Sequence, residues 1–97
     1  MTTSNENLQI MSDIYKLLGD LTRLRIMLIC LDEQISVNDI AKKLNVSQSL
    51  VSHNLRLLKA ARLVTSTRQN KQIFYQAADN HIRHILTDTL DHIKNCS

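Results

Sequence analysis

Residues 36–61 read SVNDIAKKLNVSQSLVSHNLRLLKAA. Ser36 followed by Asp39 resembles a capping box, with Asp in place of the usual Glu, and it opens a short helix with apolar residues on one side. A tight connection follows, and Ser47 caps a second helix because its hydroxyl can accept a hydrogen bond from the first turn. Two short helices joined by a tight turn predict a helix–turn–helix unit.

Further elements flank this unit on both sides. Apolar residues at helical spacing precede it, and two strand-like segments joined around Asn70, which tolerates a left-handed backbone, follow it. Asp79 caps a last helix. The order predicts a mainly α (α+β) fold, a winged helix–turn–helix with an additional helix at each end, in one domain spanning residues 1–97. The expected elements are helices over about 5–18, 21–31, 37–44, 48–61 and 80–95, and a hairpin, the wing, over about 63–77.

The charges of the chain are separated along its length. The 97 residues include 12 Lys and Arg and 9 Asp and Glu, a net charge of +3. All nine acidic residues lie outside residues 40–78, whereas seven of the twelve basic residues lie inside. A surface selected for solubility alone mixes both signs, whereas a surface that binds DNA gathers cations, because each one near a phosphate releases condensed counterions. The acid-free segment, residues 40–78, therefore predicts nucleic-acid binding.

Other function classes fit the sequence less well. No apolar run approaches the length of a membrane span, and the first residues lack the features of a secretory signal. The two cysteines match no zinc-finger or redox spacing, so we expect reduced thiols in the cytoplasm. An enzyme is not expected, because the sequence has no Gly-rich phosphate-binding loop and no recognisable set of a nucleophile with its activating base. A protein-interaction module is the remaining rival, and the acid-free segment argues against it.

The second helix of the helix–turn–helix has two distinct faces. Val51, Leu55 and Leu58 fall at helical spacing and should face the core. The opposite face carries short or forked hydrogen-bonding side chains, which suit base edges and phosphates, although a solvated polar face is the simpler alternative and His53 could instead be structural. The predicted DNA contacts are Gln48, Ser49, Ser52, His53 and Arg56 on this helix, Lys42 and Lys43 on the preceding helix, and Arg68 and Lys71 in the wing.

From Leu18 onward the chain resembles the ArsR/SmtB family of bacterial metal-responsive repressors. The matching segments are LGDLTRLR at residues 18–25, SQSLVSH at residues 47–53 and the basic wing RQNKQIFY at residues 68–75. The resemblance implies a homodimer, built from the first and last helices, that represses transcription by binding an imperfect palindrome in double-stranded DNA. Members of the family usually leave the DNA when metal binds. Asn70 stands where the family usually has Gly at the wing tip.

The resemblance also implies where metal would bind. The thiolate site of some members places Cys-x-Cys at the start of the third helix, and residues 35–39 contain no Cys. The zinc and cobalt sensors use Asp-x-His-x10-His-x2-(His or Glu) in the last helix, matched here by Asp79, His81, His92 and, as a departure, Asn95. The two imidazoles lie roughly 16 Å apart along one helix, so a single helix cannot bring both to one ion. Two such helices packed antiparallel in a homodimer can.

Two points stay open at this site, the fourth ligand and the choice of residues along the helix. A neutral amide such as Asn95 is a poor zinc ligand, so water or Cys96 could complete the coordination. His84, Asp88 and His92 form an alternative stripe at i, i+4 and i+8. Imidazole and carboxylate donors favour Zn(II) or Co(II) over Cu(I).

An alternative function does not involve metal. Cys30 and Cys96 could sense oxidants or persulfides, although Cys30 is more simply interpreted as a small buried residue.

Overall fold

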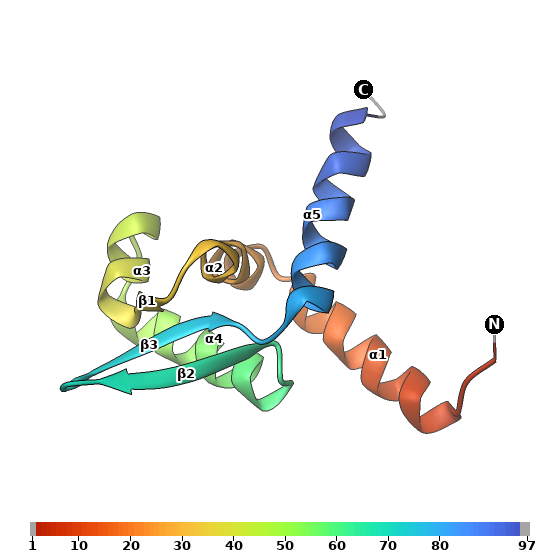
Figure 1. Cartoon of the computed structure of the whole chain (residues 1–97), viewed down its shortest axis with the longest axis horizontal. Helices are drawn as coiled ribbons and strands as arrows, with labels where there is room; N and C mark the ends of the chain where they lie inside the picture. The colour runs from red at the N-terminus through yellow and green to blue at the C-terminus, as the bar shows by residue number, and fades with distance from the viewer. Residues whose placement is uncertain (1, 96–97) are drawn as a thin grey trace.

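The computed structural model describes residues 2–95. It confirms the predicted mainly helical, winged helix–turn–helix fold (Figure 1). The helices and strands begin and end within one residue of the expected positions, apart from a short strand that was not predicted. The elements are α1 (Asn5–Leu18), α2 (Leu21–Asp32), β1 (Ile35–Ser36), α3 (Val37–Leu44), α4 (Gln48–Ala60), β2 (Val64–Gln69), β3 (Gln72–Ala77) and α5 (Asn80–Asn95).

Three of the helices, α3, α4 and α5, begin directly after the predicted capping residues. Ser36 Oγ accepts from the backbone N–H of Asp39 at 3.2 Å, and Ser47 Oγ accepts from the N–H of Leu50 at 3.1 Å. At the start of α5, an Asp79 carboxylate oxygen accepts from the N–H of Ile82 at 3.1 Å. Each bond satisfies one backbone donor that the first turn of a helix leaves without a partner, which fixes where the helix begins.

The sheet has three antiparallel strands in the order β1-β3-β2. The wing is the β2–β3 hairpin, closed by the pair Gln69 and Gln72. At its tip Asn70 has φ 59°, the left-handed backbone that was predicted there. The unpredicted strand β1 has only two residues, which pair with Tyr75 and Phe74. Two residues carry no recognisable alternation, so β1 exists only because the fold places it beside β3.

The core lies around α2, which packs against α1, α3, α4 and β3. The largest side chains with almost no exposed surface come from α2, α3, α4 and the start of the sheet. They are Ile26, Met27, Ile40, Val51, Leu55, Leu58, Leu63 and Val64. This arrangement makes α2 the centre of the core and confirms that the apolar face of α4 points inward. It holds α4 firmly while the other face of that helix stays in solvent.

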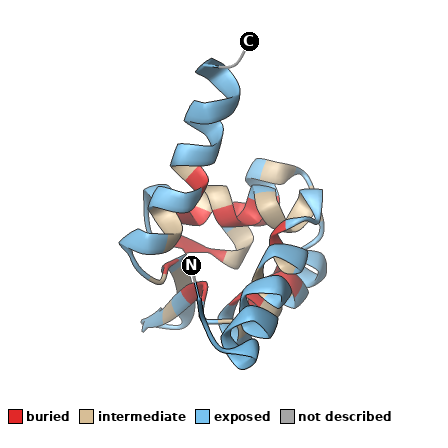
Figure 2. Cartoon of the chain, turned by 90° about the vertical axis from the view of Figure 1, so that its right-hand side faces the viewer, coloured by how far each residue is buried: buried red, intermediate tan, exposed pale blue. Residues whose placement is uncertain are grey.

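The terminal helices extend away from this core. Figure 1 shows α1 and α5 at the end of the molecule opposite the wing tip. Each helix has one buried residue, Leu18 in α1 and Leu86 in α5, and Figure 2 shows most of α5 exposed. The Arg83 guanidinium donates to the Leu31 carbonyl and so ties the first part of α5 to the end of α2. Within residues 2–95, no helix combines the length and the apolar character needed to cross a membrane.

Candidate nucleic-acid interface and metal site

The polar face of α4 lies where the sequence predicted it. Gln48, Ser49, His53 and Arg56 are exposed and Ser52 is half-buried. On the opposite side of the same helix, Val51, Leu55 and Leu58 have no exposed surface. The helix therefore presents hydrogen-bonding side chains outward from a rigid support, an arrangement that suits insertion into a major groove. That these side chains contact DNA stays a prediction.

A surface hollow joins this face to the wing. It lies between the first turns of α3 and α4 and the hairpin, and its lining includes the predicted residues Gln48, Ser52 and Lys71. Two residues that the sequence analysis did not select, Asn38 and Gln72, line it as well. The Gln48 side-chain amide donates to Asn38 Oδ1 at 2.9 Å, which orients both amides. Residues from three elements thus converge on one polar surface.

The lysines of α3 are both exposed in its last turn. Lys43 Nζ lies 3.8 Å from a carboxylate oxygen of Glu33, which precedes the acid-free segment. Both side chains are more than half exposed, so this pair contributes little stability, and a phosphate can compete for the ammonium group. Lys42 and Lys43 therefore remain available for the backbone contacts predicted for them.

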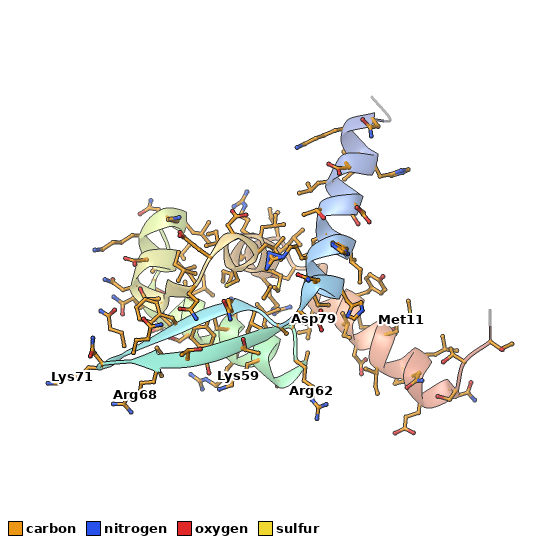
Figure 3. All side chains as sticks on the ribbon, viewed as in Figure 1. Met11, Lys59, Arg62, Arg68, Lys71 and Asp79 are labelled. Carbon is orange, nitrogen blue, oxygen red and sulfur yellow. The ribbon has the colours of Figure 1, made fainter. Side chains whose placement is uncertain are left out.

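Four basic residues follow one edge of the molecule. Figure 3 shows Lys71 and Arg68 at the wing, followed by Lys59 near the end of α4 and Arg62 in the turn after it. The sequence analysis selected Arg68 and Lys71 but not Lys59 or Arg62. Their position inside the acid-free segment was the signal that could have identified them. We call these four residues the basic edge.

Arg62 has an unusual backbone. Its φ is 62°, and the N–H groups of Arg62 and Leu63 donate to the carbonyls of Lys59 and Leu58 at 3.0 and 2.9 Å. These are the two hydrogen bonds of a Schellman motif, in which Gly is the preferred left-handed residue. Within residues 2–95, the other two non-Gly residues with positive φ are Asn45 and Asn70, and Asn is a residue type that tolerates this backbone. A left-handed backbone at an Arg costs roughly 1–2 kcal/mol.

A buried polar contact links α4 to the end of α1. Asn54 is 3% exposed, and its Oδ1 accepts from Arg23 Nε at 3.1 Å. Arg23 Nη1 also donates to the Leu17 carbonyl at 3.0 Å, and the Asn54 amide donates to the Leu50 carbonyl at 3.0 Å. The first Arg of the LGDLTRLR segment therefore positions the exposed helix α4 relative to α1. The sequence analysis missed this role, because the two residues are far apart in the chain.

The candidate metal ligands fall into two groups on α5. At its start, Asp79 Oδ1 lies 3.7 Å from His81 Nδ1, and both side chains are exposed. His92 and Asn95 are exposed near the other end of the helix. No three potential ligands gather within residues 2–95, including the alternative stripe His84, Asp88 and His92. One chain thus supplies a carboxylate and an imidazole side by side, which fits part of a metal site and needs further ligands from elsewhere.

Cys30 is sealed inside the core. It is 1% exposed, and burial raises the pKa of its thiol to about 12. The thiolate is the reactive form, so burial makes this thiol inert at neutral pH. This confirms the interpretation of Cys30 as a small core residue. Cys96, the other member of the suggested thiol pair and a suggested fourth metal ligand, lies outside the described residues.

Comparisons with known proteins agree with these features. Residues 20–66 match the family "Bacterial regulatory protein, arsR family". A transcriptional repressor SmtB homolog from Synechocystis sp. is 35% identical over 91 residues, covering 94% of this chain and 69% of that protein. The HTH-type transcriptional repressor SmtB of Mycobacterium tuberculosis is 34% identical over 87 residues, covering 90% of this chain and 64% of its own length. The chain thus spans about two thirds of the length of these relatives.

Solved structures give the same result. NolR from Sinorhizobium fredii has a TM-score of 0.82 at 27% identity, covering 96% of this chain and 95% of that one. The solution structure of apo-NmtR has a TM-score of 0.81 at 25% identity, covering 98% of this chain and 80% of that one. The sequence relatives are named as transcriptional repressors or regulators and not as enzymes, among them the HTH-type transcriptional regulator NmtR of Mycobacterium tuberculosis. The chain belongs to the ArsR/SmtB family of bacterial transcriptional regulators.

Proposed function

We propose that this protein is a homodimeric transcriptional repressor that acts in the cytoplasm and leaves its operator when Zn(II) or Co(II) binds between the two α5 helices. The observation that carries the metal proposal is the adjacent pair Asp79 and His81 at the start of an exposed helix, with His92 eleven residues further on. One relative has a name that points the same way, the cadmium resistance transcriptional regulatory protein CadC homolog of Staphylococcus aureus.

DNA recognition is assigned to α4 and the wing. The exposed face of α4 enters the major groove, where Arg56, His53 and the neighbouring hydroxyl and amide groups have the donors and acceptors needed to read base edges. Lys42 and Lys43 lie at the end of the preceding helix and contact phosphates. Arg68 and Lys71 extend the contact along the wing to the neighbouring backbone or minor groove. The contacts to phosphate fix the position of the protein along the duplex, and the contacts of α4 to base edges supply the sequence preference.

The dimer is assigned to α1 and α5. These helices leave large apolar side chains exposed, namely Leu8, Ile10, Met11, Tyr15, Ile85, Leu90 and Ile93. A second copy of the chain would cover these surfaces and would place the two α4 helices about 34 Å apart, the separation of successive major grooves. Because the dimer has two-fold symmetry, its operator is an imperfect palindrome.

The donors of α5 suit the proposed metals. A carboxylate and imidazoles are ligands of Zn(II) and Co(II), whereas the soft thiolates that other metals prefer are missing from residues 35–39. Asp79 and His81 of one protomer and the His92 of its partner would hold each ion. Asn95 is a weak donor in the fourth position, so water or Cys96 completes the coordination. The metal supplies a bridge between protomers and no chemical step.

Release from DNA requires that the metal bind one arrangement of the dimer more tightly than the other. Only this difference in affinity can shift the equilibrium away from the DNA-binding arrangement, and such couplings are typically about 1–3 kcal/mol. The Arg83 guanidinium ties α5 to the Leu31 carbonyl at the end of α2. A change in the angle between the two α5 helices would therefore also move α2 and the DNA-binding elements packed on it, in both protomers.

The test uses His81→Ala and His92→Ala, with His84→Ala as the matched control. DNA binding is measured by fluorescence anisotropy on a duplex selected by the wild-type protein from a random pool. We expect all three variants to bind the duplex, and zinc to release the wild type and His84→Ala but not the other two. The absorption spectrum of the cobalt-loaded protein reports the number of ligands and any sulfur.

Two outcomes would overturn parts of this proposal. If His81→Ala and His92→Ala still release DNA on zinc addition, the assigned metal site is wrong. If His84→Ala loses the zinc response as well, the stripe that includes Asp88 becomes the better candidate. Release by oxidants or persulfides in place of zinc would support the thiol alternative.

A further inference from the structure

A second hollow lies at the far end of α4. It is formed by the last turn of α4, the turn that follows it and the start of β2, and it is lined by Lys59, Arg62, Val64, Thr65, Ser66 and Ala78. Lys59 Nζ donates to Ser66 Oγ at 2.7 Å, which holds the ammonium group over the sheet. Two cations beside two hydroxyl groups form a donor set suited to phosphate oxygens.

No carboxylate of the described residues neutralises the positive charge of this hollow. Among residues 2–95, neither Lys59 nor Arg62 forms an ion pair with a carboxylate, whereas Lys43 has Glu33 beside it. Figure 3 shows that Lys59 and Arg62 continue the basic edge that begins at Lys71 and Arg68 in the wing. A positive potential therefore extends along the molecule from the wing tip to the turn after α4.

The residue type at position 62 gives an independent indication. The Schellman motif after α4 requires a left-handed backbone at this position, where Gly is preferred. In the described part of the chain, the two other left-handed positions are occupied by Asn, whereas this one is occupied by Arg at a cost in stability. A strained residue that persists in a structure is often retained for function. Here the functional group is a guanidinium that projects from the basic edge (Figure 3).

We propose that Lys59 and Arg62 form a phosphate-binding arm of the DNA interface. The arm contacts the backbone of the duplex beyond the wing, at the end of the basic edge that is nearer to α1. It binds without regard to sequence, because phosphates carry no base identity. The inference rests on the proposed DNA binding and adds a contact region that neither the polar face of α4 nor the wing supplies.

The test measures the salt dependence of binding to a non-specific duplex of about 30 base pairs, roughly three helical turns. The variants are Arg62→Gly and Lys59→Gln, compared with wild type by fluorescence anisotropy over a series of KCl concentrations. Each lost phosphate contact lowers the slope of log affinity against log salt by about one. We expect a decrease of about one for each variant and of about two for the double variant.

Two controls separate a local contact from other causes. Arg62→Lys keeps the charge and should keep the slope, and Arg25→Gln removes one exposed charge outside the acid-free segment and should also keep it. Arg62→Gly should retain or raise the melting temperature, because Gly relieves the left-handed strain at this position. Arg62→Asn provides a second neutral variant that tolerates this backbone, in case the Gly variant folds poorly.

The outcomes distinguish this inference from the proposed function. If the wild type shows no salt-dependent affinity for DNA, the proposed DNA binding fails. If the wild type binds with a steep slope and Arg62→Gly and Lys59→Gln keep it, the phosphate-binding arm is wrong. An equal loss of slope in Arg25→Gln would overturn it too, because the effect would then come from net charge alone.

Discussion

The body of the molecule, from α2 to β3, and the two terminal helices place their apolar side chains differently. In the body, Ile26, Leu55 and Leu58 have no exposed surface. In α1 and α5, by contrast, Met11 is 50% exposed and Ile93 is 60% exposed, although both helices are amphipathic. Burial of apolar surface is the main term that favours folding. The body therefore buries its core side chains within one chain. The apolar side chains of the terminal helices can be buried only against a surface from another molecule.

Under the proposed function, this difference would separate DNA recognition from metal sensing. The body holds α4 and the wing in fixed positions, as recognition of DNA requires. The last helix, α5, and its capping residue Asp79 carry the candidate metal ligands, and in the proposed dimer a second copy would complete the site. A signal that changes how the terminal helices pack would then move two rigid bodies without unfolding either.

The largest expected effect comes from truncating the core of the body. Leu55→Ala removes a side chain with 0% exposure, and we expect the free energy of unfolding to fall by about 2–5 kcal/mol because a cavity remains. Leu50→Ala in the same helix, where Leu50 is 40% exposed, should cost about 1 kcal/mol or less. Urea denaturation at one fixed protein concentration measures both. Equal losses would show that α4 is not anchored as described.

Removing the Arg23–Asn54 contact, which links the body to α1, should have the next largest effect on the free energy of unfolding. Arg23→Met leaves the buried Asn54 Oδ1 without its donor, at an expected cost of about 1–3 kcal/mol in unfolding free energy. Arg25→Met, on the exposed side of the same helix, should change it by about 0.5 kcal/mol or less.

Adding Asn54→Leu to Arg23→Met should recover part of the loss, because both polar partners are then replaced. If Arg23→Met is no worse than Arg25→Met in the same denaturation series, the contact does not position α4.

The terminal helices should respond in assembly rather than in folding. Ile93→Glu places a charge on the exposed apolar face of α5, and we expect the dimer dissociation constant to rise at least tenfold, about 1.4 kcal/mol. Sedimentation velocity across a concentration series measures it. Ile73→Glu, at an apolar side chain of the wing that is also largely exposed, is the matched control and should leave assembly unchanged. Identical behaviour of the two variants would argue against dimerisation through α5.

The smallest expected effect is at Cys30, which tests how tightly the body is closed. Because burial raises the pKa of this thiol to about 12, the thiolate forms only as the pH rises toward that value. At pH 8 we therefore expect iodoacetamide to alkylate Cys30 far more slowly in the native protein than in urea. Peptide mass spectrometry locates and quantifies the product. Rapid native labelling would mean that the body opens readily and would revive the thiol alternative.

Most of the fold was predictable because its signals are local. A capping hydroxyl such as that of Ser47 lies three residues from the N–H it binds, and the apolar spacing of α4 repeats within one helix. The polar face of α4 followed from the same periodicity. The strand β1 could not be predicted, because a two-residue strand is defined only by its partner β3.

The candidate site was less accessible to prediction from sequence. Asn38 and Gln72 join the hollow beside α4 only because the hairpin folds back toward α3. Arg23 and Asn54 are 31 residues apart, and nothing local to either position indicates their contact. Arg62 looked like an ordinary surface cation until its backbone conformation was known.

The sequence by itself determined the helix boundaries, the two faces of α4, the acid-free segment and the spacing of His81 and His92, because each depends on residues close together in the chain. Only the tertiary structure decided which of these features share a surface. It aligned Lys71, Arg68, Lys59 and Arg62 along one edge, and it left the apolar faces of α1 and α5 exposed. The physical reason is that packing of the core around α2, and not local conformational preference, fixes the relative positions of distant segments.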